Sequence, residues 1–161
     1  MPKQLFLLRH AKSSWDDPAL ADHDRPLAPR GRKAAALMAS YLSEERIRPA
    51  LVLCSTAVRA RETLEGIGLS DHVIFARELY GASADELLAR LRRVPDEIES
   101  AMLVGHNPGM HDLALLLGGT GDIERKFPTG ALATFAFDGG WSGLGQGRAE
   151  LVAFVRPKQL G

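Results

Sequence analysis

Three short apolar runs, each followed at once by polar or basic residues, constrain the fold of this chain more than any other feature. The runs and the residues after them are Leu5–Leu8 with Arg9 and His10, Leu51–Cys54 with Ser55 and later Arg59, and Ala101–Val104 with Gly105 and His106. Uninterrupted apolar runs of this length are typical of strands buried on both faces of a parallel sheet. Ligands of such sheets bind at the carboxyl ends of the strands. We therefore expect the two arginines and two histidines to meet at one edge of a sheet.

The segments between these runs predict helices that alternate with further strands. The expected helices are Arg30–Glu45, Ala57–Gly66, Ala84–Arg93 and Gly109–Leu117, and the further strands are His72–Ala76, Ala131–Phe137 and Ala149–Val155, the last two able to pair as a hairpin. Ser13–Leu27 is expected to be a long ordered loop and Gly139–Gly147 a loose one. The alternation predicts an α/β fold with a mainly parallel sheet covered on both faces. Without a linker or an internal repeat, residues 1–161 are expected to form a single domain.

Polar residues mark the expected starts of the helices. Ser55 or Thr56 is predicted to cap the second helix, and Asn107 the fourth. Ser83, followed three residues later by Glu86, predicts a capping box.

The charge balance excludes several classes of partner. The chain has 20 basic and 20 acidic residues, and its formal net charge is zero. A general nucleic-acid or membrane-surface binder would carry an excess of basic residues, so neither partner is expected. The one cysteine, Cys54, is expected to be a buried thiol. The sequence shows neither a membrane-spanning stretch nor a signal-peptide pattern, which predicts a cytoplasmic location.

The predicted cluster of cations and imidazoles favours a phosphoryl group as its ligand. Arg9 and Arg59 each offer a planar fork that matches two phosphate oxygens. His10 is a candidate nucleophile: the arginines should lower its pKa, and a backbone carbonyl should hold one ring nitrogen while the other faces phosphorus. His106, at a helix N-terminus, could donate to a phosphate oxygen. The alternative is a metal site that includes His111, but the five-residue spacing from His106 does not match helical zinc ligands.

The same residues lie in three motifs that resemble those of a known family. Leu8-Arg9-His10-Ala11-Lys12, Ser55-x-x-x-Arg59-Ala60-x-Glu62-Thr63 and Gly105-His106-Asn107-Pro108 resemble, in order, the three signatures of the histidine phosphatase superfamily, also called phosphoglycerate mutase-like. The segments around Asp24-Arg25-Pro26-Leu27 and Glu78-Leu79-Tyr80-Gly81 are most similar to the short SixA-type phosphohistidine phosphatases. One departure is Ala11, where the superfamily usually has glycine; the methyl group should be tolerated.

The resemblance implies a fold and a reaction. It implies a three-layer α/β/α fold whose mixed, mainly parallel six-stranded sheet contains one antiparallel strand. It implies that His10 is transiently phosphorylated, and that Arg9, Arg59 and His106 complete the phosphate pocket. No metal and no organic cofactor are expected.

The proton donor is expected among four carboxylates. Glu78, on the loop after the third strand, matches the place of a glutamate in the mutase-like branch, and Asp16, Asp17 and Asp24 are its rivals. A phosphohistidine substrate would reduce the need for a donor, because the P–N bond is weak and the departing imidazole protonates easily.

The expected substrate is a phosphohistidine on another protein, with inorganic phosphate as the product. Because large capping insertions are absent, the pocket should be open, with Lys12, Arg25 and Asn107 as candidate flanking residues. Trp15 could line the entrance, although core packing is slightly favoured. Two alternatives remain: a phosphatase or mutase acting on a small phosphate ester, and a non-catalytic module that binds phosphate or a phosphoprotein.

Overall fold

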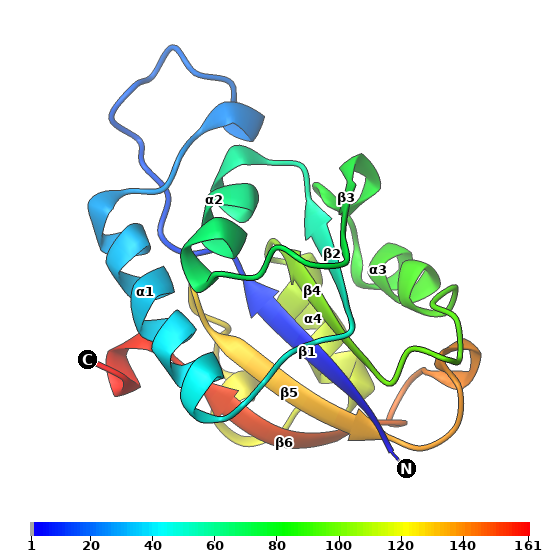
Figure 1. The fold of residues 1–161 in the computed structure, drawn as a ribbon. Helices are drawn as coiled ribbons and strands as arrows, with labels where there is room; N and C mark the ends of the chain where they lie inside the picture. The colour runs from blue at the N-terminus through cyan, green and yellow to red at the C-terminus, as the bar shows by residue number, and fades with distance from the viewer. Residues whose placement is uncertain (1) are drawn as a thin grey trace.

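A computed structural model describes residues 2–161, and its centre is a six-stranded sheet (Figure 1). The strands are β1 (Lys3–Arg9), β2 (Leu51–Ser55), β3 (Val73–Ala76), β4 (Ser100–Gly105), β5 (Leu132–Phe137) and β6 (Glu150–Val155), in the spatial order β3-β2-β4-β1-β5-β6. β1, β2, β3 and β4 are parallel, whereas β5 is antiparallel to both β1 and β6. The sheet is therefore mixed and mainly parallel, with one antiparallel strand, as expected.

The register between β1 and β4 brings two predicted site residues together. These strands are adjacent and parallel, and Arg9 pairs with Gly105 at their carboxyl ends. The next residue on each strand is a histidine, and the His10 amide donates to the Gly105 carbonyl over 3.0 Å. His10 and His106 consequently leave the sheet side by side.

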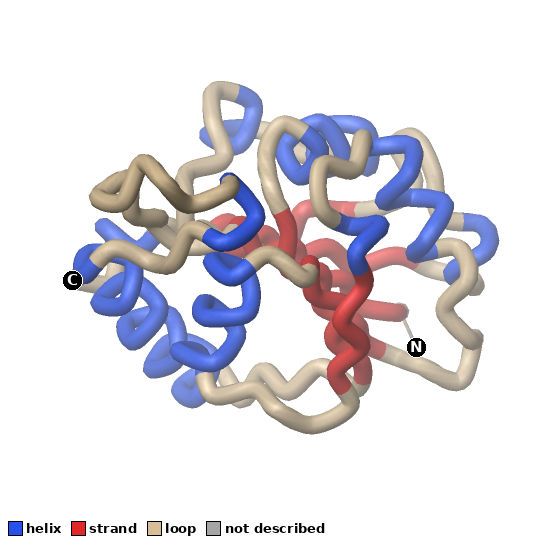
Figure 2. Tube along the Cα trace, turned by 90° about the horizontal axis from the view of Figure 1, so that it is seen from above, coloured by secondary structure: helices blue, strands red, loops and turns tan. Residues whose placement is uncertain are grey.

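Four helices cover the two faces of the sheet. They are α1 (Pro29–Glu44), α2 (Val58–Ile67), α3 (Ala84–Leu91) and α4 (Gly109–Leu117). The helix α1 packs beside α2, and α3 beside α4. The view along the sheet in Figure 2 shows helices on either side of the strands, which gives the three layers of an α/β/α fold.

Alternate residues of the buried strands divide between two apolar cores. On β1, Leu5 and Leu7 pack with residues of α3 and α4, whereas Phe6 and Leu8 pack with residues of α1 and α2. Successive strand side chains point to opposite faces of a sheet, so a strand covered on both sides needs an unbroken apolar run. Such burial explains the runs in the sequence, and Cys54 is fully buried in the second core.

The glycine-rich segment 139–147 is better ordered than its composition suggested. It contains a turn of 3₁₀ helix, Trp141–Gly143, and the Trp141 side chain is fully buried against Phe137. The Trp141 indole N–H donates to the Ile98 carbonyl over 2.7 Å. The expectation of a loose loop is wrong, because burial of this aromatic side chain fixes the segment. The preceding and following strands, β5 and β6, do pair as a hairpin.

The helix starts follow the predicted caps fully in one of three cases. Ser83 and Glu86 form the predicted capping box. Pro108, not Asn107, is the N-cap residue of α4, although the Asn107 side chain accepts from the His111 amide in the first turn over 3.2 Å. The prediction for α2 is wrong, because Ala57 is its N-cap residue and makes no side-chain cap bond. The hydroxyls of Ser55 and Thr56 instead contact His106 and His23.

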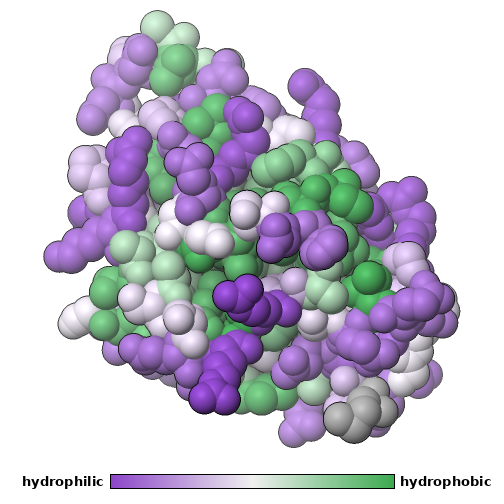
Figure 3. Space-filling view, in the orientation of Figure 1, coloured by the Kyte–Doolittle hydropathy of each residue, from purple (hydrophilic) through white to green (hydrophobic). Residues whose placement is uncertain are grey.

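The edge strand β3 exposes apolar side chains to solvent. On β3, Ile74 and Phe75 are 44% and 50% exposed. Apolar side chains, in green, gather over this strand in Figure 3. None of the helices in residues 2–161 is both long enough and apolar enough to cross a bilayer.

A glycine holds the segment after His10 against the start of α1. A Cβ placed on Gly31 would lie 2.1 Å from the Lys12 carbonyl oxygen, which also accepts from the Ala28 amide over 2.9 Å. Only a residue without a side chain permits this close approach.

We expect Gly31→Ala to lower the free energy of unfolding by about 1–3 kcal/mol, because the new methyl group must push the Lys12 backbone away from α1. The matched control is Gly143→Ala, since a Cβ at Gly143 meets nothing within 4 Å. It should stay within about 0.5 kcal/mol of the wild type. Urea unfolding of the two variants measures the difference, and equal midpoints would contradict this account of Gly31.

Candidate active site

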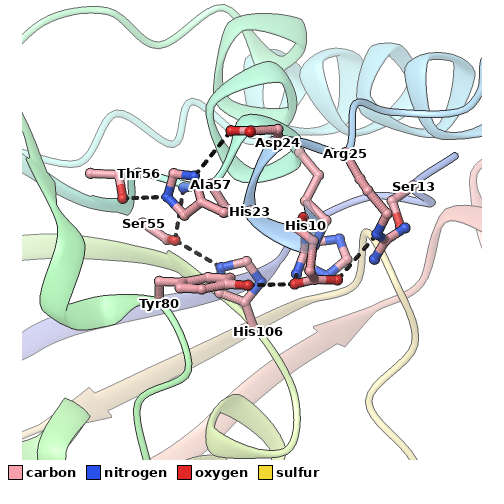
Figure 4. A network of polar contacts seen from close by, with 12 residues as sticks. His10, Ser13, His23, Asp24, Arg25, Ser55, Thr56, Ala57, Tyr80 and His106 are labelled. Carbon is pink, nitrogen blue, oxygen red and sulfur yellow. Dashed lines mark hydrogen bonds and ion pairs between the residues drawn. The ribbon is translucent and has the colours of Figure 1, made fainter. Parts of the chain in front are cut away.

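The structure brings the two predicted histidines and two predicted arginines to one edge of the sheet. The rings of His10 and His106 lie 5.1 Å apart between centroids, and Figure 4 shows them beside Tyr80. Burial, and then the nearby Arg59 charge, lower the pKa of Arg9. His10, Arg59 and His106 are each less than a tenth exposed. These four side chains therefore form a small, buried and strongly cationic cluster at the edge of the sheet.

The contacts of His10 leave one ring nitrogen available as a nucleophile. Its Nδ1 lies 2.7 Å from the Ala11 carbonyl oxygen, and since a carbonyl can only accept, Nδ1 carries the hydrogen. Burial is the main cause that lowers the His10 pKa to about 3. The charges of His106, Arg59 and Arg9 also lower this pKa, whereas the hydrogen bond to the Ala11 carbonyl raises it. The ring is neutral near pH 7, and Nε2 keeps its lone pair.

His106 is also neutral, and its contacts favour one tautomer. Burial, and then the Arg59 charge, lower its pKa to about 4. Its Nε2 lies 2.8 Å from the Ser55 hydroxyl, which already accepts from the Ala57 amide. The Ser55 hydroxyl hydrogen is thus free to donate to Nε2. That arrangement favours a hydrogen on Nδ1 of His106, where it is a donor.

Three buried nitrogen atoms of this cluster have no hydrogen-bond partner in the described part of the chain. They are Arg9 Nε, Arg59 Nε and His106 Nδ1. Buried donors in native proteins are nearly always paired, so three orphans in one cluster indicate a missing acceptor. An anion with several oxygens would satisfy them together.

The polar residues of the second motif hold different parts of the site. Besides Ser55, which contacts His106, Thr63 accepts from the Ala11 amide over 2.9 Å and donates to the Arg59 carbonyl over 2.7 Å. Glu62 accepts from the Leu27 amide over 2.8 Å. One helix therefore fixes the residue after His10, the arginine and the end of the long loop.

Ala11 fits without strain at the position where the superfamily usually has glycine. It is fully buried, and it is not among the non-glycine residues with a positive φ. The prediction that its methyl group is tolerated is confirmed.

A loop carboxylate that the sequence analysis missed completes the charge balance. The Asp22 carbonyl and carboxylate accept from Arg59 Nη1 and Nη2 over 2.6 and 2.9 Å. The Tyr80 hydroxyl donates to the same carboxylate, and Arg25 Nε donates to its other oxygen over 3.1 Å. These donors, Tyr80 and then Arg59 first among them, hold the Asp22 pKa well below its usual range. Asp22 is therefore ionised and orients the Arg59 guanidinium.

The carboxylates predicted as proton donors lie outside this network. Glu78 is exposed on a 3₁₀ turn, Arg77–Leu79, directly before Tyr80. Asp16 and Asp17 are exposed on the long loop, and Asp24 lies 3.6 Å from His23. None of the four makes a hydrogen bond or ion pair with the two histidines and two arginines within residues 2–161.

The predicted flanking residues have three different environments. Lys12 is exposed. Arg25 is buried and donates to the Ser13 hydroxyl over 2.7 Å, which ties the ends of the long loop together. Asn107 donates to the Phe127 carbonyl, the same oxygen that accepts from Arg9 Nη1. It therefore helps to position the acceptor of Arg9. The prediction that Trp15 packs in the core is wrong. Its side chain is 71% exposed, and the Arg25 Cζ atom lies 3.5 Å from the centroid of its ring.

The third histidine of the metal alternative has a structural contact. His111 Nε2 lies 2.6 Å from the Ile123 carbonyl oxygen. Within residues 2–161, no group of three or more His, Cys, Asp or Glu side chains is arranged to hold a metal ion.

The two depressed histidine pKa values predict a loss of stability in mild acid. Below the ordinary histidine pKa of about 6.5, the unfolded chain takes up protons that the folded His10 and His106 refuse until about pH 3 and 4. The free energy of unfolding should therefore fall as the pH drops from 6.5 to 4. Urea unfolding at several pH values should show a shallower slope for His10→Asn, and an unchanged slope would contradict the neutral state of His10.

Comparisons with known proteins agree with this geometry. Residues 5–79 match the model of the histidine phosphatase superfamily (branch 1). The phosphohistidine phosphatase SixA of Escherichia coli is 30% identical over 84% of this chain and 86% of its own. A structure from Nakamurella multipartitia, assigned to SixA, is 35% identical, with a TM-score of 0.89 over 98% of this chain and 97% of its own. The protein histidine phosphatase SixA complexed with tungstate is 26% identical, with a TM-score of 0.82 over 98% and 99%. The chain belongs to the histidine phosphatase superfamily, among its SixA-type members.

Proposed function

We propose that this chain is a metal-independent phosphatase that acts through a phosphohistidine intermediate on His10. The observation that carries the proposal is the set of orphan donors, Arg9 Nε, Arg59 Nε and His106 Nδ1, next to a neutral His10. Phosphoryl transfer requires positive charge around the equatorial oxygens and a nucleophile in line with the leaving group. These residues supply both. Residues 1–161 act as a single catalytic domain.

The reaction proceeds in two balanced steps. In the first, the His10 Nε2 lone pair attacks phosphorus, an N–P bond forms on His10, and the bond between phosphorus and the leaving group breaks. The leaving group takes up a proton. In the second, water attacks the phosphorus and gives up a proton to solvent or to the carboxylate that served as donor, the bond to Nε2 breaks, and inorganic phosphate leaves. The arginines and His106 hold the three phosphoryl oxygens throughout.

We further propose that the substrate is a phosphohistidine on another protein. The SixA-type relatives, named as phosphohistidine phosphatases, support this substrate class. Tungstate in the SixA relative is an oxyanion, as a phosphoryl group is. The exposure of Trp15 and of the loop around it supports a site that a side chain of another protein can enter. The cytoplasmic location stays a prediction.

Glu78 is proposed as the proton donor for substrates with poor leaving groups. It is exposed and comes two residues before Tyr80, whose ring lies 5.4 Å from that of His106. Asp22 is a weaker candidate, because Tyr80 and Arg59 keep its pKa low and its carboxylate ionised.

Replacing the nucleophile tests the reaction. His10→Asn should lower kcat for p-nitrophenyl phosphate and for a phosphohistidine protein by at least about a thousandfold. The wild type, quenched in alkali during turnover, should carry a phosphoryl group that acid releases, and the variant should not. His72→Asn is the matched control, because His72 is an exposed histidine far from the site with a φ of 55° that asparagine tolerates. Near-normal turnover by His10→Asn would refute the proposal.

Metal independence has its own test. Assays of the wild type with and without EDTA should give the same rates.

The role of Glu78 is tested by the leaving group. An alkyl phosphate needs a proton on its departing oxygen more than an aryl phosphate does, so Glu78→Gln should reduce kcat for the alkyl ester by about 10²–10⁴-fold and for p-nitrophenyl phosphate much less. Glu97→Gln, at another exposed carboxylate, is the control. Asn variants of Asp16, Asp17 and Asp24 are measured in parallel. Equal losses on both esters would remove Glu78 from the role.

A further inference from the structure

A concave site near the proposed phosphate site carries five cationic residues among its nine lining residues. It has a volume of about 230 Å³, and its lining residues are Lys12, Arg30, Ala34, Lys126, Pro128, Thr129, Arg156, Pro157 and Lys158. We call it the basic pocket. Five of these residues are cationic and none is acidic. In Figure 1 the C-terminal turn, in red, lies against α1. Both elements contribute lining residues, Arg30 and Ala34 from α1 and Pro157 and Lys158 from the turn.

The cations of the basic pocket are mostly without counter-charges. Arg156 forms an ion pair with Asp122 over 3.3 Å, but that carboxylate is 64% exposed. The four other cations take part in no ion pair within residues 2–161. No acidic residue lies in the first turn of α1, whose N-terminal dipole adds positive potential beside Arg30. Unpaired like charges repel one another, so this arrangement favours an anionic ligand.

The basic pocket is joined to the phosphate pocket through the backbone. Phe127 lies between the lining residues Lys126 and Pro128, and its carbonyl accepts from Arg9 Nη1 over 3.0 Å. The Gly130 amide, next to the lining residue Thr129, contacts the carbonyls of Arg9 and His10, each over 3.0 Å. Lys12 is two residues after His10, so their Cα atoms are at most about 7.6 Å apart. A substrate held on His10 can therefore reach the basic pocket.

We propose that the basic pocket binds an acidic segment of the phosphoprotein whose phosphohistidine enters the His10 site. This inference rests on the function proposed above and names the surface of the partner. The chain has no net charge, so the five cations here leave the remaining surface with an excess of acids. An acidic partner is attracted at this pocket, which orients it relative to the His10 site. An extended peptide spans about 3.3 Å per residue, so acidic side chains three to five residues from the phosphohistidine are within reach.

Two peptides and three variants test the proposal. Each peptide carries one phosphohistidine, flanked at three to five residues on both sides by glutamates in one and by glutamines in the other. The inhibition constant of each against p-nitrophenyl phosphate hydrolysis is measured, together with its own kcat and KM. For the wild type we expect binding of the glutamate peptide to be about tenfold tighter, a preference that shrinks at high salt. Lys126→Glu and Lys158→Glu should abolish the preference by raising KM, with kcat and the rate on p-nitrophenyl phosphate unchanged.

The control variant and the inhibition constants separate the possible failures. Arg93→Glu makes the same charge reversal at an exposed residue outside the pocket, and it should keep the wild-type preference. If the wild type binds both peptides equally, or if Arg93→Glu loses the preference as well, the basic pocket does not recognise an acidic partner. If Lys126→Glu weakens only the binding of a small bisphosphate such as fructose 1,6-bisphosphate, the ligand is a small molecule and the proposal fails. Failure to hydrolyse either peptide would refute the proposed substrate, yet the inhibition constants would still decide the pocket's role.

Discussion

The parallel pairing of β1 with β4 is the constraint on which the whole site depends. It sets Arg9 opposite Gly105, and the next residue along the chain after each is a histidine. Both strands are buried on their two faces, so neither can shift by one residue without turning its apolar side chains to the wrong core. The hydrophobic packing of β1 and β4 therefore keeps His10 and His106 in register. The loops that follow add charge to a geometry that the sheet has already determined.

Burial, reinforced by electrostatic repulsion in this small volume, explains the protonation states of the site. Two guanidinium groups and two imidazoles share a buried region, and the histidines relieve the repulsion by staying neutral. The arginines cannot lose their protons, so Arg59 is balanced by Asp22, which reaches it from a loop 37 residues earlier in the chain. The neutral histidines are then available as a nucleophile and as a hydrogen-bond donor.

Patterns of neighbouring residues in the sequence predicted the strands and the side chains at their ends. The apolar runs predicted the central strands, and the three motifs predicted which side chains meet at their ends. Asp22 was missed because the loop that carries it has no periodicity and contains three other aspartates, so nothing nearby marks the one that contacts Arg59. The predictions for Trp15 and for the segment 139–147, which contains Trp141, were both wrong. Trp15 stacks on a cation at the surface and Trp141 is buried within a glycine-rich segment, and both outcomes depend on distant partners that a linear pattern does not contain.

The double contact between Asp22 and Arg59 links the long loop to occupancy of the site. The guanidinium is bonded to both the backbone and the side chain of one loop residue, so neither can move far without the other. Asp22 occupies Nη1 and Nη2 of Arg59 and leaves Nε free, so a movement of the loop that carries Asp22 also moves the donor proposed to hold an anion. By thermodynamic reciprocity, an anion in the site and a partner bound to the loop then change each other's affinity by the same factor. The exposed indole of Trp15 on that loop gives a natural optical signal of this coupling.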